Sequence, residues 1–134
     1  MCSGSSACSQ IAAALLRHVA DDHYEVTCAC IGSGAIHPNA IWTLEKYGVP
    51  AAGLQPKVLA AVAGEPFDYV ITLGDRALER CPIFPRADML HWSLADPSMV
   101  SSDVQARAFD DVFRVLLNRI RLLVTVNERR IEHA

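Results

Sequence analysis

The first residues of the chain hold its clearest candidate for chemistry, a thiol placed just ahead of a helix. Cys2 is followed by five small residues, which are Ser3, Gly4, Ser5, Ser6 and Ala7. A backbone with so little bulk can curl and aim several N–H groups inward. A helix that begins near Ser9 adds further unpaired N–H groups and the positive end of its dipole. Together these groups could bind a tetrahedral oxyanion and favour the thiolate form of Cys2.

A purely structural interpretation of this segment stays open from the residues alone. Cys2 could be a residue of an N-terminal tail, and Ser9 could serve only as the N-cap of the helix.

The remaining cysteines allow a second kind of chemistry, which is binding of a soft metal. Cys28 and Cys30 lie two residues apart, so a strand would present both thiols on one face. Together with Cys2, Cys8 or Cys81 they could complete a site for zinc or trivalent arsenic. The spacing lacks the C-x2-C signature of zinc sites, and buried cysteine often acts as a small hydrophobic residue. We therefore predict no metal site and no cofactor.

Composition limits the partners and the compartment of the protein. A chain of 134 residues predicts one domain over residues 1–134. A net charge of −3 and a pI near 5.9 give no attraction to nucleic acid. Its apolar runs fall short of the roughly 20 residues of a membrane span, and no secretory signal is recognisable. Five cysteines, an odd number, suit a reducing cytoplasm better than a disulfide framework.

The hydrophobic pattern places these residues on alternating strands and helices. It predicts helices over 9–20, 40–47, 57–63 and 104–123, and strands over 24–30, 67–73 and 89–92. We expect the last helix to fray near Asn127 and to bury one face, made of Val104, Ala108, Val112, Val115, Leu116 and Ile120. The order indicates a three-layer α/β fold, a small parallel sheet flanked by helices.

One element of such a fold is missing from the predicted order. The loop after Cys2 should follow a buried strand, yet only Met1 precedes it. Either that strand is absent or the start of the chain has been assigned too late. We expect the second, because losing a central parallel strand would expose the core.

Four segments, in this order, resemble the low-molecular-weight protein tyrosine phosphatases, and most closely the thioredoxin-coupled arsenate reductases that share their fold. The opening is similar to the C-x5-R-S-Q-x-A-x-x-L-L segment of that branch. The other three similar segments are Ala35-Ile-His-Pro-Asn-Ala-Ile41, then Phe67-Asp-Tyr-Val-Ile-Thr72 with Asp75-Arg76-Ala77 and Cys81-Pro82, and finally His91-Trp92-Ser93-Leu94-Ala95-Asp96-Pro97.

The resemblance implies a definite mechanism and definite partners. Cys2 would be the nucleophile toward arsenate or phosphate, with Ser9 stabilising its thiolate. Asp96 would protonate the leaving oxygen. Cys81 matches the last thiol of the relay that ends in a disulfide, which a thioredoxin-type reductant opens.

Two positions depart from the family pattern. The arginine that clamps the oxyanion is Cys8 here, and the middle thiol of the relay is Gly74. Losing the guanidinium removes a charge-assisted pair worth about 1.5–3 kcal/mol. Cys8 becomes a candidate resolving partner for Cys2, as part of the oxyanion loop. Three functions therefore stay open: an arsenate reductase-like enzyme, a phosphatase, and a non-catalytic relative that senses oxyanions or thiol-reactive species or serves in protein interaction.

Overall fold

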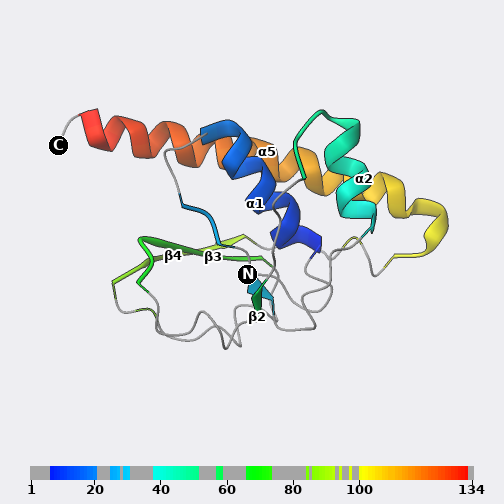
Figure 1. The fold of residues 1–134 in the computed structure, drawn as a ribbon, viewed down its shortest axis with the longest axis horizontal. Coiled ribbons are helices and arrows are strands. Elements are labelled where there is room, and N and C mark those ends of the chain that lie inside the picture. Colours follow the sequence, from blue (N-terminus) through cyan, green and yellow to red (C-terminus); the bar gives the residue numbers. More distant parts are fainter. Residues whose placement is uncertain are drawn as a thin grey trace.

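The fold combines three described helices with two pairs of parallel strands (Figure 1). The computed structural model describes residues 7–20, 25–27, 29–30, 38–51, 57–58, 66–73, 84, 86–92, 94, 97 and 100–132. The helices are α1 (Ala7–Ala20), α2 (Pro38–Lys46) and α5 (Ser102–Glu132). The strands are β1 (Ala29–Cys30), β2 (Lys57–Val58), β3 (Tyr69–Leu73) and β4 (Asp88–Trp92).

All the described strand pairs are parallel, as the alternating pattern predicts. β3 pairs with β4 from Tyr69 opposite Asp88 to Leu73 opposite Trp92, and β1 pairs with β2 through Ala29 opposite Lys57. The longer ladder is covered on both faces at β3, because Thr72 is fully buried on one face and Leu73 is 2% exposed on the other. A strand enclosed in this way explains the nearly continuous apolar run in its sequence.

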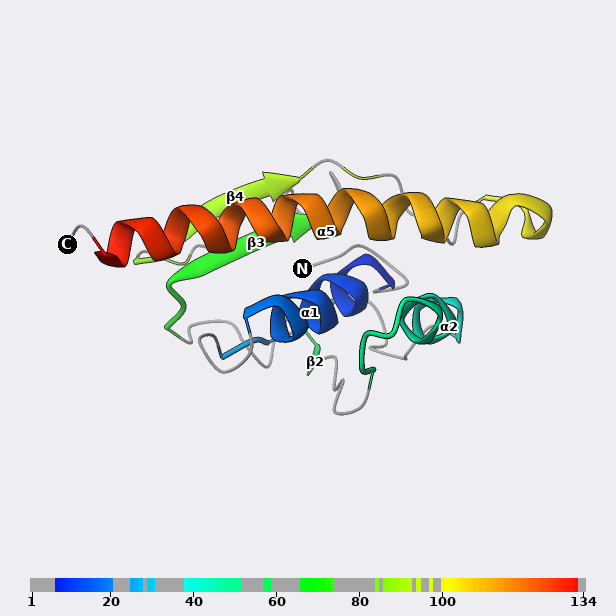
Figure 2. The same cartoon turned by 90° about the horizontal axis from the view of Figure 1, so that it is seen from above.

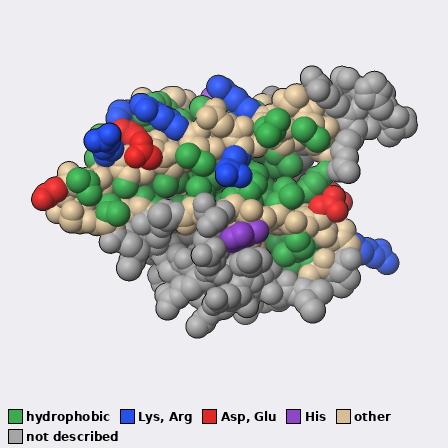
Figure 3. Space-filling view, turned by 180° about the vertical axis from the view of Figure 1, so that it is seen from behind, with side chains coloured by type: hydrophobic (Ala, Val, Ile, Leu, Met, Phe, Trp, Pro, Cys, Tyr) green, Lys and Arg blue, Asp and Glu red, His purple; other side chains and the backbone are tan. Residues whose placement is uncertain are grey.

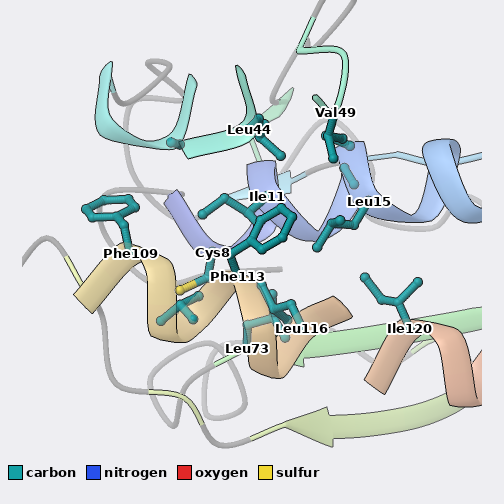
Figure 4. Close-up of a cluster of buried hydrophobic side chains, with 14 of the residues drawn as sticks. Cys8, Ile11, Leu15, Leu44, Val49, Leu73, Phe109, Phe113, Leu116 and Ile120 are labelled. Atoms are coloured by element: carbon teal, nitrogen blue, oxygen red, sulfur yellow. The ribbon is translucent and has the colours of Figure 1, made fainter. Parts of the chain in front are cut away.

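The three helices pack against one another, and α5 lies over β3 and β4 (Figures 1 and 2). Their shared core contains Ile11 and Leu15 of α1, Leu44 of α2, and Phe109 and Leu116 of α5 (Figure 4). Apolar residues at helical spacing on α1 and α5 supply most of this cluster, so burial of these stripes holds the layer together.

Helix α5 runs antiparallel to β3 and β4, and two contacts fix the alignment. The Tyr69 hydroxyl at the start of β3 donates to Asn127 Oδ1 at 2.7 Å. At the other end of the ladder, the Arg119 guanidinium carbon lies 5.9 Å from the centroid of the Trp92 ring. The eight residues from Arg119 to Asn127 rise about 12 Å along α5. The four steps of the ladder from the level of Tyr69 to that of Trp92 rise about 13 Å, so the two contacts are spaced equally on the helix and on the strands.

Helix α2 is joined to α5 by polar and aromatic contacts along one face. Asn39 donates to Gln105, and Lys46 Nζ donates to Asp110 Oδ2 at 2.9 Å. The Tyr47 ring stacks on Phe113 with centroids 4.3 Å apart.

The end of α2 is a Schellman motif centred on glycine. Gly48 has a φ of 71°, its N–H bonds the carbonyl of Glu45, and the N–H of Val49 bonds the carbonyl of Leu44 at 2.9 Å. Val49 and Leu44 are both buried, which supplies the hydrophobic contact that accompanies this motif.

Several predicted element boundaries are wrong. Residues 57–58, expected to begin a helix, form strand β2, because pairing with β1 outweighs local helical preference. The strand expected over 24–30 is reduced to Ala29–Cys30 in the described residues, since 25–27 have no regular structure. Helix α5 does not fray at Asn127; it continues to Glu132, supported by the contact of Asn127 with Tyr69.

The buried face of α5 is also rotated relative to the prediction. Val112, Leu116 and Ile120 are buried as expected, but Val104 and Val115 are 50% and 39% exposed. Three residues that the prediction left out are buried instead, and these are Phe109, Phe113 and Val124. Seen from behind, hydrophobic and charged side chains are mixed over the described surface (Figure 3). None of the described helices is both long and apolar enough to cross a membrane.

Candidate oxyanion site at the start of α1

The first turn of α1 carries the electrostatic features that the sequence predicted for an anion site. The helix begins at Ala7, and no Asp or Glu lies in its first turn. Its first N–H groups have no intrahelical acceptor, so they and the helix dipole leave positive potential at this end. Arg17 and His18 in the last turn complement the opposite end. Helix α5 differs, because Asp103 already lies in its first turn.

This first turn lies at the carboxyl ends of β3 and β4. Leu73 and Trp92, the last residues of these strands, share a core cluster with Cys8. Figure 4 shows the strands running toward the end of α1 at which Cys8 lies. In a parallel α/β fold, ligands bind in the crevice outside the carboxyl ends of the strands. Leu73 and Trp92, after which the sequence continues toward Cys81 and Asp96, therefore lie beside the start of α1.

Cys8, the residue at the position of the family arginine, contributes to the core. Its side chain is 1% exposed, and its sulfur points toward α5 in Figure 4. It is present as a buried thiol. A small, weakly polar group suits this apolar position, whereas a charged group would lose its hydration there.

Ser9 and Gln10 complete the buried first turn. Their exposed fractions are 4% and 0%, so both are polar residues inside the protein. Buried polar groups are almost always hydrogen-bonded. Ser9 is the third residue of α1 and therefore not its N-cap, and its role toward the Cys2 thiolate stays a prediction.

The end of β4 carries contacts that the sequence pattern did not indicate. Thr72 Oγ1 lies 2.8 Å from His91 Nδ1 and joins β3 to β4 one residue before their ends. Arg119 of α5 covers the Trp92 ring, and Pro97 is fully buried. Register and long-range packing create these contacts, and no local signal in the sequence marks Arg119 or Thr72.

Several predicted site residues lie outside the described residues. These are Cys2, Ser3, Gly4, Ser5, Ser6, Gly74, Cys81 and Asp96. Their predicted roles stay predictions. Cys28 is likewise outside, and Cys30 is described only as part of β1. Within the described ranges, no three His, Cys, Asp or Glu side chains are grouped to hold a metal ion.

Comparison with known proteins identifies the family. The family model described as low molecular weight phosphotyrosine protein phosphatase matches residues 1–132. The chain belongs to this family. Within it, the arsenate reductase of Shouchella clausii (strain KSM-K16) is 26% identical over 108 residues, covering 80% of this chain and 78% of the relative.

Solved structures of the family support the fold. An arsenate reductase in the phosphate binding state superposes with a TM-score of 0.75 at 23% identity, covering 92% of each chain. The thioredoxin-dependent arsenate reductase of Corynebacterium glutamicum is 32% identical with a TM-score of 0.65, covering 90% of this chain and 59% of that longer one. The small parallel sheet with helices is therefore the phosphatase-family fold, and homology to the arsenate reductases is distant.

Proposed function

We propose that this protein is an arsenate reductase-like enzyme that acts on a tetrahedral oxyanion at the first turn of α1. The observation that carries the proposal is the placement of the N-terminus of α1, whose first turn holds no Asp or Glu, at the carboxyl ends of β3 and β4, directly after the segment that begins with Cys2. The relatives named as arsenate reductases support the choice of substrate. We also infer that residues 1–134 form one domain, since the family match spans 1–132.

The proposed reaction begins with attack of the Cys2 thiolate on the arsenic of arsenate. A hydroxide leaves as water after Asp96 protonates it, and a Cys2–arsenate ester forms. A second thiol then attacks the Cys2 sulfur. The S–As bond breaks, arsenic(V) takes two electrons and leaves as arsenite, and the two sulfurs form a disulfide. A cytoplasmic thioredoxin-type dithiol reduces that disulfide.

The burial of Cys8 bears on which thiol performs the second step. A resolving thiol must reach the Cys2 sulfur, and the two Cβ atoms of a disulfide lie about 3.5–4.5 Å apart. Because the Cys8 sulfur points toward α5 inside the core, this role would require the first turn of α1 to open. Cys81 is therefore the better candidate for the resolving thiol.

Two other functions compete with this one. A phosphatase would depend more heavily on the missing arginine, because the guanidinium stabilises the charge that develops in the transition state. A non-catalytic sensor of oxyanions or thiol-reactive species, or an interaction domain, would keep the helix N-terminus without needing a relay, and the loss of the arginine and of the middle thiol favours it.

The decisive assay follows arsenate-dependent NADPH oxidation with thioredoxin and thioredoxin reductase supplied. We expect turnover by the parent, none by Cys2→Ser or Cys81→Ser, and retained turnover by Cys8→Ala. Release of phosphate from p-nitrophenyl phosphate by the parent, without arsenate reduction, would favour the phosphatase. Silence in both assays together with measurable oxyanion binding would favour the sensor.

A further inference from the structure

Within the described part of the chain, strand β4 joins the core of the helix layer through one buried side chain at its carboxyl end. All five of its residues are described, and only Trp92 is buried, at 9% exposed. Asp88 and Met89 at the other end are exposed. The Trp92 ring, which joins the core cluster of α1 and α5, is therefore the anchor of β4 outside its ladder with β3.

Arg119 covers this anchor from α5. Its guanidinium carbon lies 5.9 Å from the centroid of the Trp92 ring, within the range of a cation–π contact. The neighbouring residues Leu116 and Ile120 are buried beneath it, so the backbone that carries Arg119 is fixed. An exposed arginine at this position closes the solvent side of an otherwise apolar contact.

The chain immediately after this anchor leads to the predicted general acid. Asp96 follows Trp92 by four residues, and its neighbour Pro97 is fully buried. The short connection therefore starts from one packed residue and returns to another. Its starting point depends on how firmly the Trp92 ring is held.

We propose that Arg119 is a positioning residue, which holds the Trp92 ring and through it the end of β4 from which the Asp96 segment departs. The inference deepens the proposed function, since positioning of Asp96 affects turnover only if the chain is an enzyme. Its structural part does not depend on turnover and can be tested separately.

Hydrogen exchange read by mass spectrometry tests the structural part in three variants of the full chain. Arg119→Met removes the cation and keeps a long apolar side chain, and Arg119→Lys restores a cation. Arg121→Met makes the same change at a neighbouring exposed arginine of α5. We expect the amides of residues 90–92, at the end of β4, to exchange about 3- to 10-fold faster in Arg119→Met. The other two variants should stay near the parent, and exchange in α5 should be unchanged in all three.

Turnover in the arsenate assay tests the functional part. If the parent is active, we expect Arg119→Met to lower kcat about 3- to 10-fold with KM unchanged, and Arg119→Lys to recover most of the loss. Unchanged exchange at residues 90–92 in Arg119→Met, or an equal rise in Arg121→Met, would overturn the inference. Faster exchange with an unchanged kcat would overturn the link to Asp96. An inactive parent would instead count against the proposed function, and the exchange result would still decide the role of Arg119.

Discussion

At the scale of single residues, Cys8 marks the difference between this candidate site and the oxyanion site that it resembles. The phosphatase family places an arginine at this position, and this chain places a buried thiol there. The positive character of the site therefore rests, within the described part of the chain, on the backbone at the start of α1. A fixed backbone dipole is weaker than a bidentate guanidinium, so we expect weaker oxyanion binding than an arginine would give.

Substitutions of Cys8 should distinguish its packing role from a redox role. Cys8→Ala removes one buried atom and should lower the free energy of unfolding by about 1–2 kcal/mol. Cys8→Arg should cost about 3 kcal/mol or more, because a guanidinium would enter an apolar core. Urea unfolding followed by circular dichroism gives both values. Equal stability of the two variants would contradict this, and recovery of Cys8→Arg by phosphate would show that its guanidinium turns toward the loop.

The Lys46–Asp110 pair should make stability depend on pH at the acid end. The hydrogen bond from Lys46 lowers the pKa of Asp110 below its usual 3.8, and the same bond to Asp110 raises the pKa of Lys46. A lowered carboxyl pKa stabilises the folded state fully above the unfolded value of 3.8, and this stabilisation is lost as pH falls through the folded value. The contribution of Lys46 is lost only as pH rises above 10.5.

Comparing the unfolding free energies of the parent and Asp110→Asn over a pH series tests whether the charge of Asp110 stabilises the fold and is lost in acid. We expect the parent to be the more stable protein near neutral pH, and the difference in unfolding free energy to shrink as pH falls below about 4. A difference that stays constant to the lowest pH at which both proteins fold would show that the charge of Asp110 contributes nothing.

At the scale of elements, the end of α2 shows a local rule that the sequence predicts well. The helix predicted over 40–47 is followed by Gly48, which adopts the left-handed conformation that a Schellman motif requires. Space around it is open, because a Cβ added there would meet no atom within 4 Å. Any cost of a side chain at this position therefore comes from the backbone conformation.

Substitution of Gly48 should isolate that backbone cost. We expect Gly48→Ala to lower the free energy of unfolding by about 1 kcal/mol, because an L-residue with a Cβ is strained at positive φ. Gly48→Asn should cost less, since asparagine tolerates this region. Chemical denaturation of the three proteins measures the difference. Equal losses in both variants would point to a cause other than the left-handed backbone.

Longer-range features of the elements could not be predicted in the same way. The helical period of α5 was clear and Val112, Leu116 and Ile120 were placed correctly, but the prediction took Val104 and Val115 as buried and left out Phe109 and Phe113. Which side faces the sheet is decided by contacts such as Asn127 with Tyr69, far apart in sequence. Strand β2 was missed for the same reason, since its partner β1 lies 28 residues earlier (57 − 29) in the ladder.

At the scale of the whole molecule, the fold and the family were predicted more securely than the site. The alternation of strands and helices indicates a parallel sheet whatever the boundaries, and the end of β3 and the start of α1 then meet by topology. The candidate residues on loops do not follow from that rule. Side-chain direction at Cys8, and the contact of Arg119 with Trp92, depend on packing that no local pattern encodes.

Oxyanion binding at the start of α1 should stabilise the whole domain. A ligand that binds only the folded state adds about 2.7 kcal/mol to the unfolding free energy at a concentration 100 times its Kd. We therefore expect the melting temperature to rise with added arsenate or phosphate, measured against sodium chloride at equal ionic strength. A rise that chloride reproduces would be a general salt effect and would contradict a specific site.

The buried thiol of Cys8 also makes it possible to measure how often the helix layer opens. A thiol reagent cannot reach a side chain that is 1% exposed, so labelling must wait until α1 separates from α5. The rate at which the peptide containing Cys8 acquires label, read by mass spectrometry, then reports how often the helix layer opens in the folded protein. The position that lacks the family arginine thus reports how often the contact between α1 and α5, on which the candidate site is built, opens.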